Sequence, residues 1–472
     1  MSQPTGRKGD VNSDEPAGSH DLTKADPCTR FESLDAPGET VGMAQMISRP
    51  GLSACSANPP SETSLVPPVS RMPIELLAEV FVHLHALIWL PNGIGPHVSH
   101  DIEETVARVC TTWRVVARGT PKLWSAIGIV SLYRHANKYL STCLQLSGDH
   151  SLSIMCLPKF LSPTILAILL PHSRRYEHLW IEHGSSAAEG WIYALLNEQR
   201  DFARLTTVGI GADVWTTSTP GIFDFLAYAP QLKKLTVFFF RDCESDAILS
   251  IPPLSSLTEL DLTYKHADLA ALLTTLSPSG PVLQEIYVDF SREQTFPDTQ
   301  PIIMSALHTL TCYDTGHIFM RYITAPNIRA ILLCAIDEHA SPCLSLLTFA
   351  SSTASLQHLQ SIEIRDGIYN FDEEASRMLL RSFERMDALR NLDLGSEIFS
   401  MSIKSSISKE LYVGLTIRDD AAVALLPALE SLVLPYWPDQ TAEWNALVRS
   451  RAVSRVVGGQ TVVALDASEH RE

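Results

Sequence analysis

The sequence predicts an α/β fold in which a small helical module is followed by a long, irregular solenoid of strand–turn–helix units. Three observations predict it. An apolar pattern recurs ten times from residue 176 onwards, helical stretches lie between its copies, and two earlier segments carry apolar residues at helical spacing. The expected order is a disordered tail (1–64), the helical module (66–127), a connecting segment (128–175), the solenoid (176–440), and a C-terminal cap and tail (441–472).

The tail at 1–64 differs in composition from the rest of the chain. It contains one aromatic residue, Phe31, together with nine acidic and five basic residues, which give it a net charge of −4. A segment with so few large apolar side chains cannot bury enough surface to offset its conformational entropy. We therefore expect this tail to be disordered.

The first helix of the module is expected in the stretch MPIELLAEVF. Pro73 suits the first turn of a helix, where its missing N–H group is not needed. Apolar residues then recur three and four positions apart from Leu76 to Leu84, as they do on one side of a helix.

A loop and two further helical segments are expected next. The loop at 89–100 is rich in Pro and Gly, and the helix after it carries an apolar face from Val106 to Val116. Gly119 ends this helix, and Pro121 in TPKLW marks a third helical start.

The repeated pattern of the solenoid reads apolar-x-x-apolar-x-apolar, as in LTTVGI at 205 and LTELDL at 257. Successive copies start 29, 27, 25, 26, 24, 21, 31, 30 and 40 residues apart. Helical stretches such as 267–276 and 373–386 separate the copies, so neighbouring units must stack to cover their apolar faces. The step of 40 predicts an insertion or a degenerate unit after residue 389.

Two regions of the chain resemble known families. The stretches MPIELLAEVF and VCTTWRVVARGTPKLW resemble the F-box, over about residues 66–127, and the rest more weakly resembles leucine-rich repeats, as in F-box proteins common in basidiomycete fungi. The chain departs from the F-box pattern twice. Met72 stands where the family usually has Leu, and the loop at 89–100 lengthens the spacing from Pro73 to Trp113 to forty residues.

The resemblance implies a substrate-recognition subunit of an SCF-type (cullin–RING) E3 ubiquitin ligase. The helical module would dock on the Skp-type adaptor, and the repeats would bind a protein substrate. The residues implied at the adaptor surface and its core are Pro73, Leu76, Leu77, Val80, Phe81, Val109, Cys110, Trp113 and Val116. Two alternatives stay open: these side chains only form an N-terminal cap on the solenoid, or the repeats are a protein-binding scaffold that acts without a ligase.

The strand positions between the buried ones are expected to face the concave side of the solenoid. The candidate substrate contacts there are Glu259, Asp261, Glu285, Tyr287, Asp289, Tyr313, Glu363, Arg365 and Asp393. Because six of these residues are acidic and two are tyrosines, we expect a basic protein partner. The alternative is that the acidic residues only solvate the sheet.

Composition and motifs exclude several function classes. A formal charge of −17 disfavours nucleic acid as a partner, and the richest apolar run, at 152–170, contains a lysine and two prolines, so no membrane span is expected. Nine scattered cysteines without a CxxC pair indicate reduced thiols and a cytoplasmic or nuclear location. No metal-ligand spacing, P-loop, GxSxG or kinase motif occurs, so we expect no cofactor and no catalytic residue, with a hydrolase on an irregular α/β fold as the enzyme alternative.

Overall fold

The structure of the protein is a computed structural model. It describes residues 72–88, 100–129, 136–156, 162–182, 201–212, 223–239, 251–263, 269–290, 300–334, 342–365, 370–395, 406–418, 423–435 and 438–470. The predicted disordered tail and almost all of the predicted loop at 89–100 lie outside these residues.

Three α-helices and a 3-10 helix come first. They are α1 (Ile74–Ile88), α2 (His100–Val109), α3 (Thr111–Arg118) and η3 (Pro121–Trp124). The helix predicted over Val106 to Val116 is therefore divided at Cys110. The backbone of Cys110 is extended, and its Sγ accepts a hydrogen bond from the backbone N–H of Trp113, 3.4 Å away, so this residue caps α3.

These helices pack through a small aromatic core. Leu77 and Phe81 of α1 are buried, and the rings of Phe81 and Trp113 lie with their centroids 5.0 Å apart. The indole Nε1 of Trp124 donates a hydrogen bond to the Ala117 carbonyl, 2.7 Å away, and so joins η3 to α3. The helical periodicity of the sequence thus positions the buried face of α1 against α3.

The rest of the described chain is built on one parallel sheet of thirteen strands, which neighbour one another in chain order. The strands are β1 (Ala126–Ile129), β2 (Leu152–Cys156), β3 (Tyr176–Glu182), β4 (Thr207–Ala212), β5 (Lys234–Phe239), β6 (Glu259–Thr263), β7 (Glu285–Phe290), β9 (Thr309–Asp314), β11 (Ala330–Cys334), β12 (Ser361–Arg365), β14 (Asn391–Asp393), β16 (Ser431–Pro435) and β19 (Asp466–His470). The predicted α/β repeat is confirmed at this level: it is a leucine-rich-repeat-like parallel sheet.

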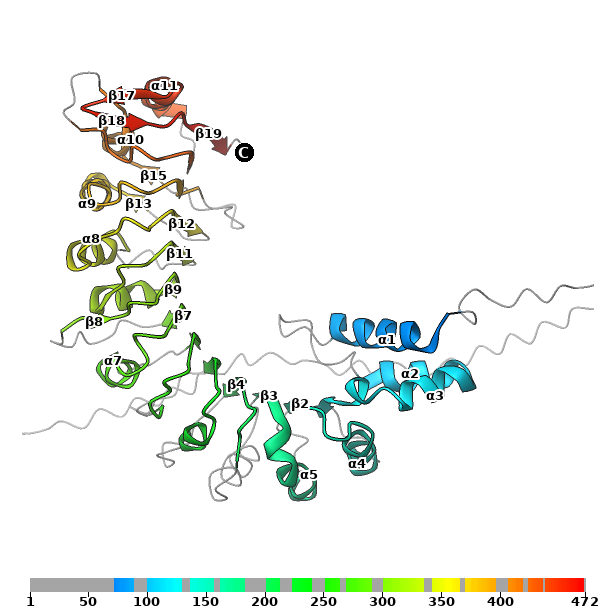
Figure 1. Ribbon diagram of the computed structural model, residues 1–472. Helices are drawn as coiled ribbons and strands as arrows, with labels where there is room; N and C mark the ends of the chain where they lie inside the picture. The colour runs from blue at the N-terminus through cyan, green and yellow to red at the C-terminus, as the bar shows by residue number, and fades with distance from the viewer. Residues whose placement is uncertain are drawn as a thin grey trace, which may run out of the picture. The chain divides into compact units, whose positions relative to one another are not determined.

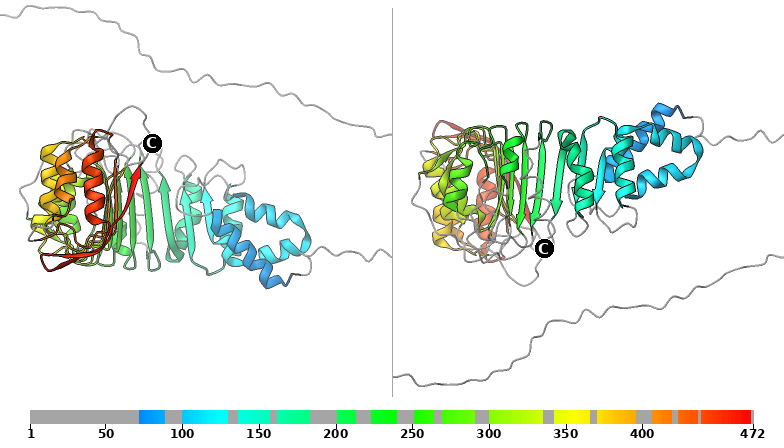
Figure 2. Two further views of the ribbon diagram at one scale, coloured as in Figure 1. Left: turned by 90° about the horizontal axis from the view of Figure 1, so that it is seen from above. Right: turned by 90° about the horizontal axis from the view of Figure 1, so that it is seen from below.

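Helices connect these strands and lie along one side of the sheet (Figure 1), as Figure 2 also shows for the helices of the C-terminal half. They are α4 (Ala136–Leu146), α5 (Pro163–Leu169), η5 (Leu170–Arg175), η6 (Asp224–Tyr228), α7 (Leu269–Leu276), η7 (Thr315–Tyr322), α8 (Pro342–Ser352), α9 (Glu373–Phe383), α10 (Lys409–Leu415), η8 (Pro438–Gln440) and α11 (Thr441–Arg451). The helices predicted at 267–276 and 373–386 correspond to α7 and α9.

Short strands pair beside the main sheet. The pairs are β8 (Ile302–Ile303) with β10 (Ile323–Thr324), β13 (Asn370–Phe371) with β15 (Ser406–Ile407), and β17 (Arg455–Val457) with β18 (Gln460–Val462). The first two pairs are parallel and the third is antiparallel. Strand β15 and helix α10 lie within the long step after residue 389, in the place that β13 and α9 occupy in the unit before it. Because β14 pairs directly with β16, this step is a single, longer unit and not an additional degenerate one.

Rows of apolar side chains fill the space between the sheet and its helices. In the middle of the sheet, Leu235, Leu260 and Ile286 lie directly opposite one another on β5, β6 and β7. All thirty apolar positions of the ten sequence copies are buried. Each such side chain stabilises the fold by about 1.5–3 kcal/mol relative to an exposed one, so the repeated pattern fixes which face of every strand points inward.

The sheet extends beyond the predicted solenoid at both ends. Strands β1 and β2 precede residue 176, and β19 follows residue 440. Before β2 the first apolar position of the pattern is taken by Asp149, and β19 reads DASEH, which has no apolar alternation. Strands β2 and β19 therefore lack the apolar pattern that the ten copies share.

Candidate functional sites

An apolar stripe is exposed on α1. Leu76, Val80 and Leu84 follow one another at intervals of four residues, so they lie in a row along the helix. Their exposed fractions are 56%, 42% and 45%, although the adjacent Leu77 and Phe81 are buried. We call these three residues the α1 stripe. Lined-up exposed leucine and valine side chains on a helix are typical of a surface that a partner covers.

A hollow of about 560 Å³ lies between α1 and α3. Ile74, Ala78 and Val115 are among its lining residues, and Ile74 and Val115 are 58% and 72% exposed. Sequence reasoning did not include either residue in the adaptor surface. Val115 lies next to Val116 in the sequence, and helical periodicity alone does not show which of two adjacent valines points inward.

The nine residues predicted at the adaptor surface and its core fall into two groups. Pro73, Leu76, Val80, Val109 and Cys110 are exposed, whereas Leu77, Phe81 and Val116 are buried and Trp113 is half-buried. The exposed group is accessible to a partner. The buried group holds the helices of the module together.

The nine predicted substrate contacts all lie on one face of the sheet, which we call the open face because the connecting helices pack against the other one. Each occupies a strand position that alternates with buried residues. Along β6, for example, half-buried residues alternate with buried ones. Within this set the structure brings four residues together on β6, β7 and β9. We call Asp261, Tyr287, Asp289 and Tyr313 the Asp–Tyr cluster.

The register of the strands assembles this cluster. Asp261 lies directly opposite Tyr287, and Asp289 lies directly opposite Tyr313. The two tyrosine rings lie with their centroids 4.8 Å apart and their planes inclined by 32°. The Oδ1 atom of Asp261 is shielded from solvent and accepts no hydrogen bond from any residue that the structure describes. A carboxylate oxygen without a donor is unusual in a shielded position.

The electrostatics of the cluster follow from this shielding. Burial raises the pKa of Asp261 to about 6, because the opposing effect of the Lys234 ammonium is smaller and the nearby Asp289 adds to the rise. Lys234 is itself paired with Glu259, with 3.0 Å between Nζ and Oε2. Burial, followed by the neighbouring Tyr313 and the two aspartates, raises the pKa of Tyr287, so its hydroxyl group stays protonated at neutral pH.

A second aromatic pair lies on the same face of the sheet. The rings of Trp180 on β3 and Phe238 on β5 have their centroids 5.9 Å apart. Between them, on β4, stands Gly209, where an added Cβ atom would lie 2.0 Å from the indole ring of Trp180. The glycine thus makes room for the tryptophan, and aromatic rings occupy the open face on β3, β5, β7 and β9.

The raised pKa of Asp261 leads to a stability prediction. The folded pKa of about 6 exceeds the ordinary value of 3.8, so the ionised carboxylate is disfavoured in the folded protein, and its stability decreases as the pH rises through this interval. We expect Asp261→Asn to increase the free energy of unfolding at pH 7 by about 1–2 kcal/mol, allowing for partial exposure of the side chain. Urea unfolding at pH 7 and at acidic pH tests it: the gain should disappear once the carboxyl group is protonated in both states. Glu285→Gln, on the same face but exposed, should give no comparable gain.

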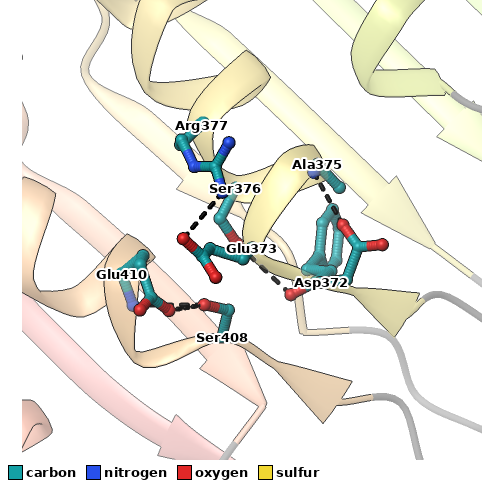
Figure 3. Close-up of polar contacts among 8 residues, drawn as sticks. Asp372, Glu373, Ala375, Ser376, Arg377, Ser408 and Glu410 are labelled. Atoms are coloured by element: carbon teal, nitrogen blue, oxygen red, sulfur yellow. Dashed lines mark hydrogen bonds and ion pairs between the residues drawn. The ribbon is translucent and has the colours of Figure 1, made fainter.

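Another hollow, of about 620 Å³, lies beside α9 and α10 near the C-terminal end. Figure 3 shows the polar contacts next to it: Arg377 pairs with Glu373, 2.7 Å away, and the Ser408 hydroxyl donates a hydrogen bond to the Glu410 carboxylate. Asp372 caps α9 by accepting a hydrogen bond from the Ala375 N–H, 2.8 Å away. These charged groups already have partners that stabilise helix ends, so the contacts are structural.

A buried histidine and serine lie together between η7 and α8. The His317 Nδ1 is 2.9 Å from the Ser345 Oγ, and Arg321 Nε donates to the same oxygen, 2.8 Å away. Burial, followed by the charge of Arg321, lowers the pKa of His317 to about 3. Both His317 and Ser345 are fully enclosed, and their third partner is a cation and not a carboxylate. This is a core hydrogen-bond network and not a hydrolase triad.

No protein-family model matches this sequence, and no curated protein matches it. Within the described residues, no three His, Cys, Asp or Glu side chains are grouped so that they could hold a metal ion. Of the helices that the structure describes, none combines the length and apolar character needed to cross a membrane.

Proposed function

We propose that the protein is the substrate-recognition subunit of an SCF-type (cullin–RING) E3 ubiquitin ligase. The module of α1, α2 and α3 docks on the Skp-type adaptor, and the open face of the sheet binds a protein substrate. The observation that carries the proposal is the α1 stripe, because two of its three residues, Leu76 and Val80, belong to the stretch MPIELLAEVF that resembles the F-box.

The α1 stripe favours docking over a purely structural cap. If the helices only capped the sheet, the large apolar side chains of α1 would be covered by the chain itself. Leu77 and Phe81 are covered, but Leu76 and Val80 are not. Complete burial of such a side chain contributes about 1.5–3 kcal/mol, so a partner that covers the stripe gains several favourable contacts from one helix.

The adaptor interaction is tested by charging the stripe. We expect the full chain to co-purify with a Skp-type adaptor when the two are expressed together, and the double variant Leu76→Glu, Val80→Glu to lose this association. The reason is that two carboxylates would have to be buried in an apolar interface without partners. Because both positions are exposed, the variant should keep its helical circular dichroism.

Val453→Glu is the matched control, since Val453 is an exposed valine in the C-terminal segment. It should co-purify with the adaptor as the wild type does. If the wild-type chain does not associate with the adaptor, or if the double variant still does, the ligase proposal is wrong. A repeat scaffold that binds a protein partner without a ligase would then replace it.

A further inference from the structure

We propose that the Asp–Tyr cluster binds a positively charged side chain, arginine or lysine, presented by a segment of a partner protein. This inference names the chemical class that the open face recognises. It rests on the proposed function only in taking that partner to be the ligase substrate.

The first support is the Asp261 carboxylate. Its Oδ1 atom is shielded from solvent and has no donor among the described residues. An acceptor in such a position is costly to leave unpaired, and the cost is greatest for a charged group. A cationic donor from a partner would pair with this oxygen and remove the cost. The site therefore favours a ligand that carries N–H groups.

The second support is the pair of tyrosines. Their rings lie with centroids 4.8 Å apart and belong to adjacent strands, next to Asp261 and Asp289. Aromatic ring faces attract guanidinium and ammonium groups, and the planar guanidinium also stacks on them. Two carboxylates beside two rings therefore offer both kinds of contact that one cationic side chain makes.

The third support is the charge of the surroundings. On β6 and β7, Glu259 and Glu285 add their carboxylates to those of Asp261 and Asp289. On β5, the neighbouring strand, Lys234 is the opposing cation, and it is engaged by Glu259. Among the described residues of β5, β6 and β7, four carboxylates on this face lie against one paired ammonium, and their negative field attracts cations and repels anions.

A pH dependence follows from the same groups. A bound cation favours the ionised form of Asp261, whose carboxyl pKa in the free protein is raised to about 6 by burial. In the part of the chain that the structure describes, the titratable groups that face it from β5, β6, β7 and β9 are Lys234, Glu259, Glu285, Asp289, Tyr287 and Tyr313. Binding should therefore weaken as the pH falls from 7 to below 6.

Fluorescence polarisation tests the proposal with the full chain and labelled Gly–Ser peptides. One peptide carries arginines, and its counterparts carry lysines or glutamines at the same positions. We expect the two cationic peptides to bind and the glutamine peptide not to bind. Asp261→Asn should weaken binding about tenfold, because a hydrogen bond to a charged group is lost. It should also remove the part of the pH dependence that Asp261 causes.

Two further variants separate the role of the rings from a loss of folding. Tyr287→Leu should weaken binding, whereas Tyr287→Phe keeps the ring and should bind nearly as the wild type does. Glu430→Gln is the control. Glu430 is an exposed carboxylate outside the Asp–Tyr cluster and pairs with Arg390, so its replacement should leave the affinity for the peptides unchanged. Since Asp261→Asn is expected to stabilise the fold, its weaker binding would not reflect unfolding.

The proposal is overturned if the glutamine peptide binds as well as the arginine peptide, or if Asp261→Asn and Glu430→Gln have the same affinity. In that case the acidic residues only solvate the sheet. These measurements need no adaptor, so their failure leaves the ligase proposal intact. Conversely, if the chain bound the cationic peptides but did not associate with the adaptor, the cation-binding site would be supported and the ligase proposal would be wrong.

Discussion

Phe81→Ala should release α1 from the helical module. Phe81 is completely buried, and its ring packs on Trp113 with 5.0 Å between the centroids. Removing a buried phenylalanine side chain costs about 3–5 kcal/mol, and loss of the aromatic pair is included in this cost. Within the described part of α1, only Leu77 and His85 are buried besides Phe81. The remaining contacts are too few to compensate for such a loss.

Hydrogen exchange followed by mass spectrometry measures this effect directly. The amides of α1 should exchange much faster in Phe81→Ala than in the wild type, because their protection depends on docking of the helix. The amides of the parallel sheet should be unchanged. Leu84→Ala is the matched control: the residue lies on the same helix but is exposed, so its truncation should leave protection intact. Equal protection of α1 in Phe81→Ala and Leu84→Ala would show that Phe81 does not anchor the helix.

Phe81→Ala also distinguishes two ways in which the chain could lose its association with the adaptor. Phe81→Ala would act through the position of α1, whereas Leu76→Glu with Val80→Glu would act at the exposed stripe itself. The first should therefore change both hydrogen exchange and adaptor association, and the second should change only the association. The distinction matters because buried and exposed members of the predicted surface cannot be told apart by co-purification alone.

Sequence periodicity was sufficient to predict the repeating part of the fold. A buried position such as Leu260 recurs at a fixed place in each copy, since only one face of each strand meets the helices. The same pattern predicts that Asp261 and Tyr287 point to the opposite face. The two residues hold equivalent positions in their copies and lie directly opposite one another, because neighbouring copies stack in register.

The parts that sequence did not predict involve polar groups and irregular elements. The copy of the pattern at β2 is incomplete because Asp149 replaces its first apolar residue, and Cys110 gives no sequence signal of a helix break. The unpaired Oδ1 of Asp261 is a matter of atomic packing. Such features arise from contacts between residues far apart in the chain, whereas periodicity reports only local preference.

Arg451 is a further residue whose role appears only in three dimensions. In the sequence it stands at the end of a helical stretch, where a basic residue is expected to lie in solvent beside the last carbonyl groups of the helix. In the structure it is completely buried. Its Nε and Nη1 donate hydrogen bonds to the carbonyls of Leu415 and Leu426, each 3.0 Å away, and its Nη2 donates to that of Leu425, 2.5 Å away.

The guanidinium thereby joins α11 to the end of α10 and to the segment before β16. Burial, followed by the charge of Arg455, lowers the pKa of Arg451 to about 10, so the side chain still carries its charge at neutral pH. Leu426 has a φ of 50°, in the left-handed region that leucine rarely adopts. The hydrogen bond to its carbonyl helps to hold this conformation.

Arg451→Met should destabilise the C-terminal units by about 2–4 kcal/mol. Each buried carbonyl left without its donor costs about 1–3 kcal/mol, and removal of a buried charge offsets part of the sum. Methionine fills a similar space, so the effect reports the lost hydrogen bonds more than a cavity. Urea unfolding monitored by hydrogen exchange of α10 and α11 measures it.

Two variants sharpen this experiment. Arg449→Met, two residues away on the exposed side of α11, should have little effect. Arg451→Lys should be nearly as destabilising as Arg451→Met, because a compact ammonium group cannot reach three carbonyls that a planar guanidinium spans. If Arg451→Lys were as stable as the wild type, the positive charge alone would be enough to stabilise the C-terminal units. The three directed hydrogen bonds of the guanidinium would then not be required.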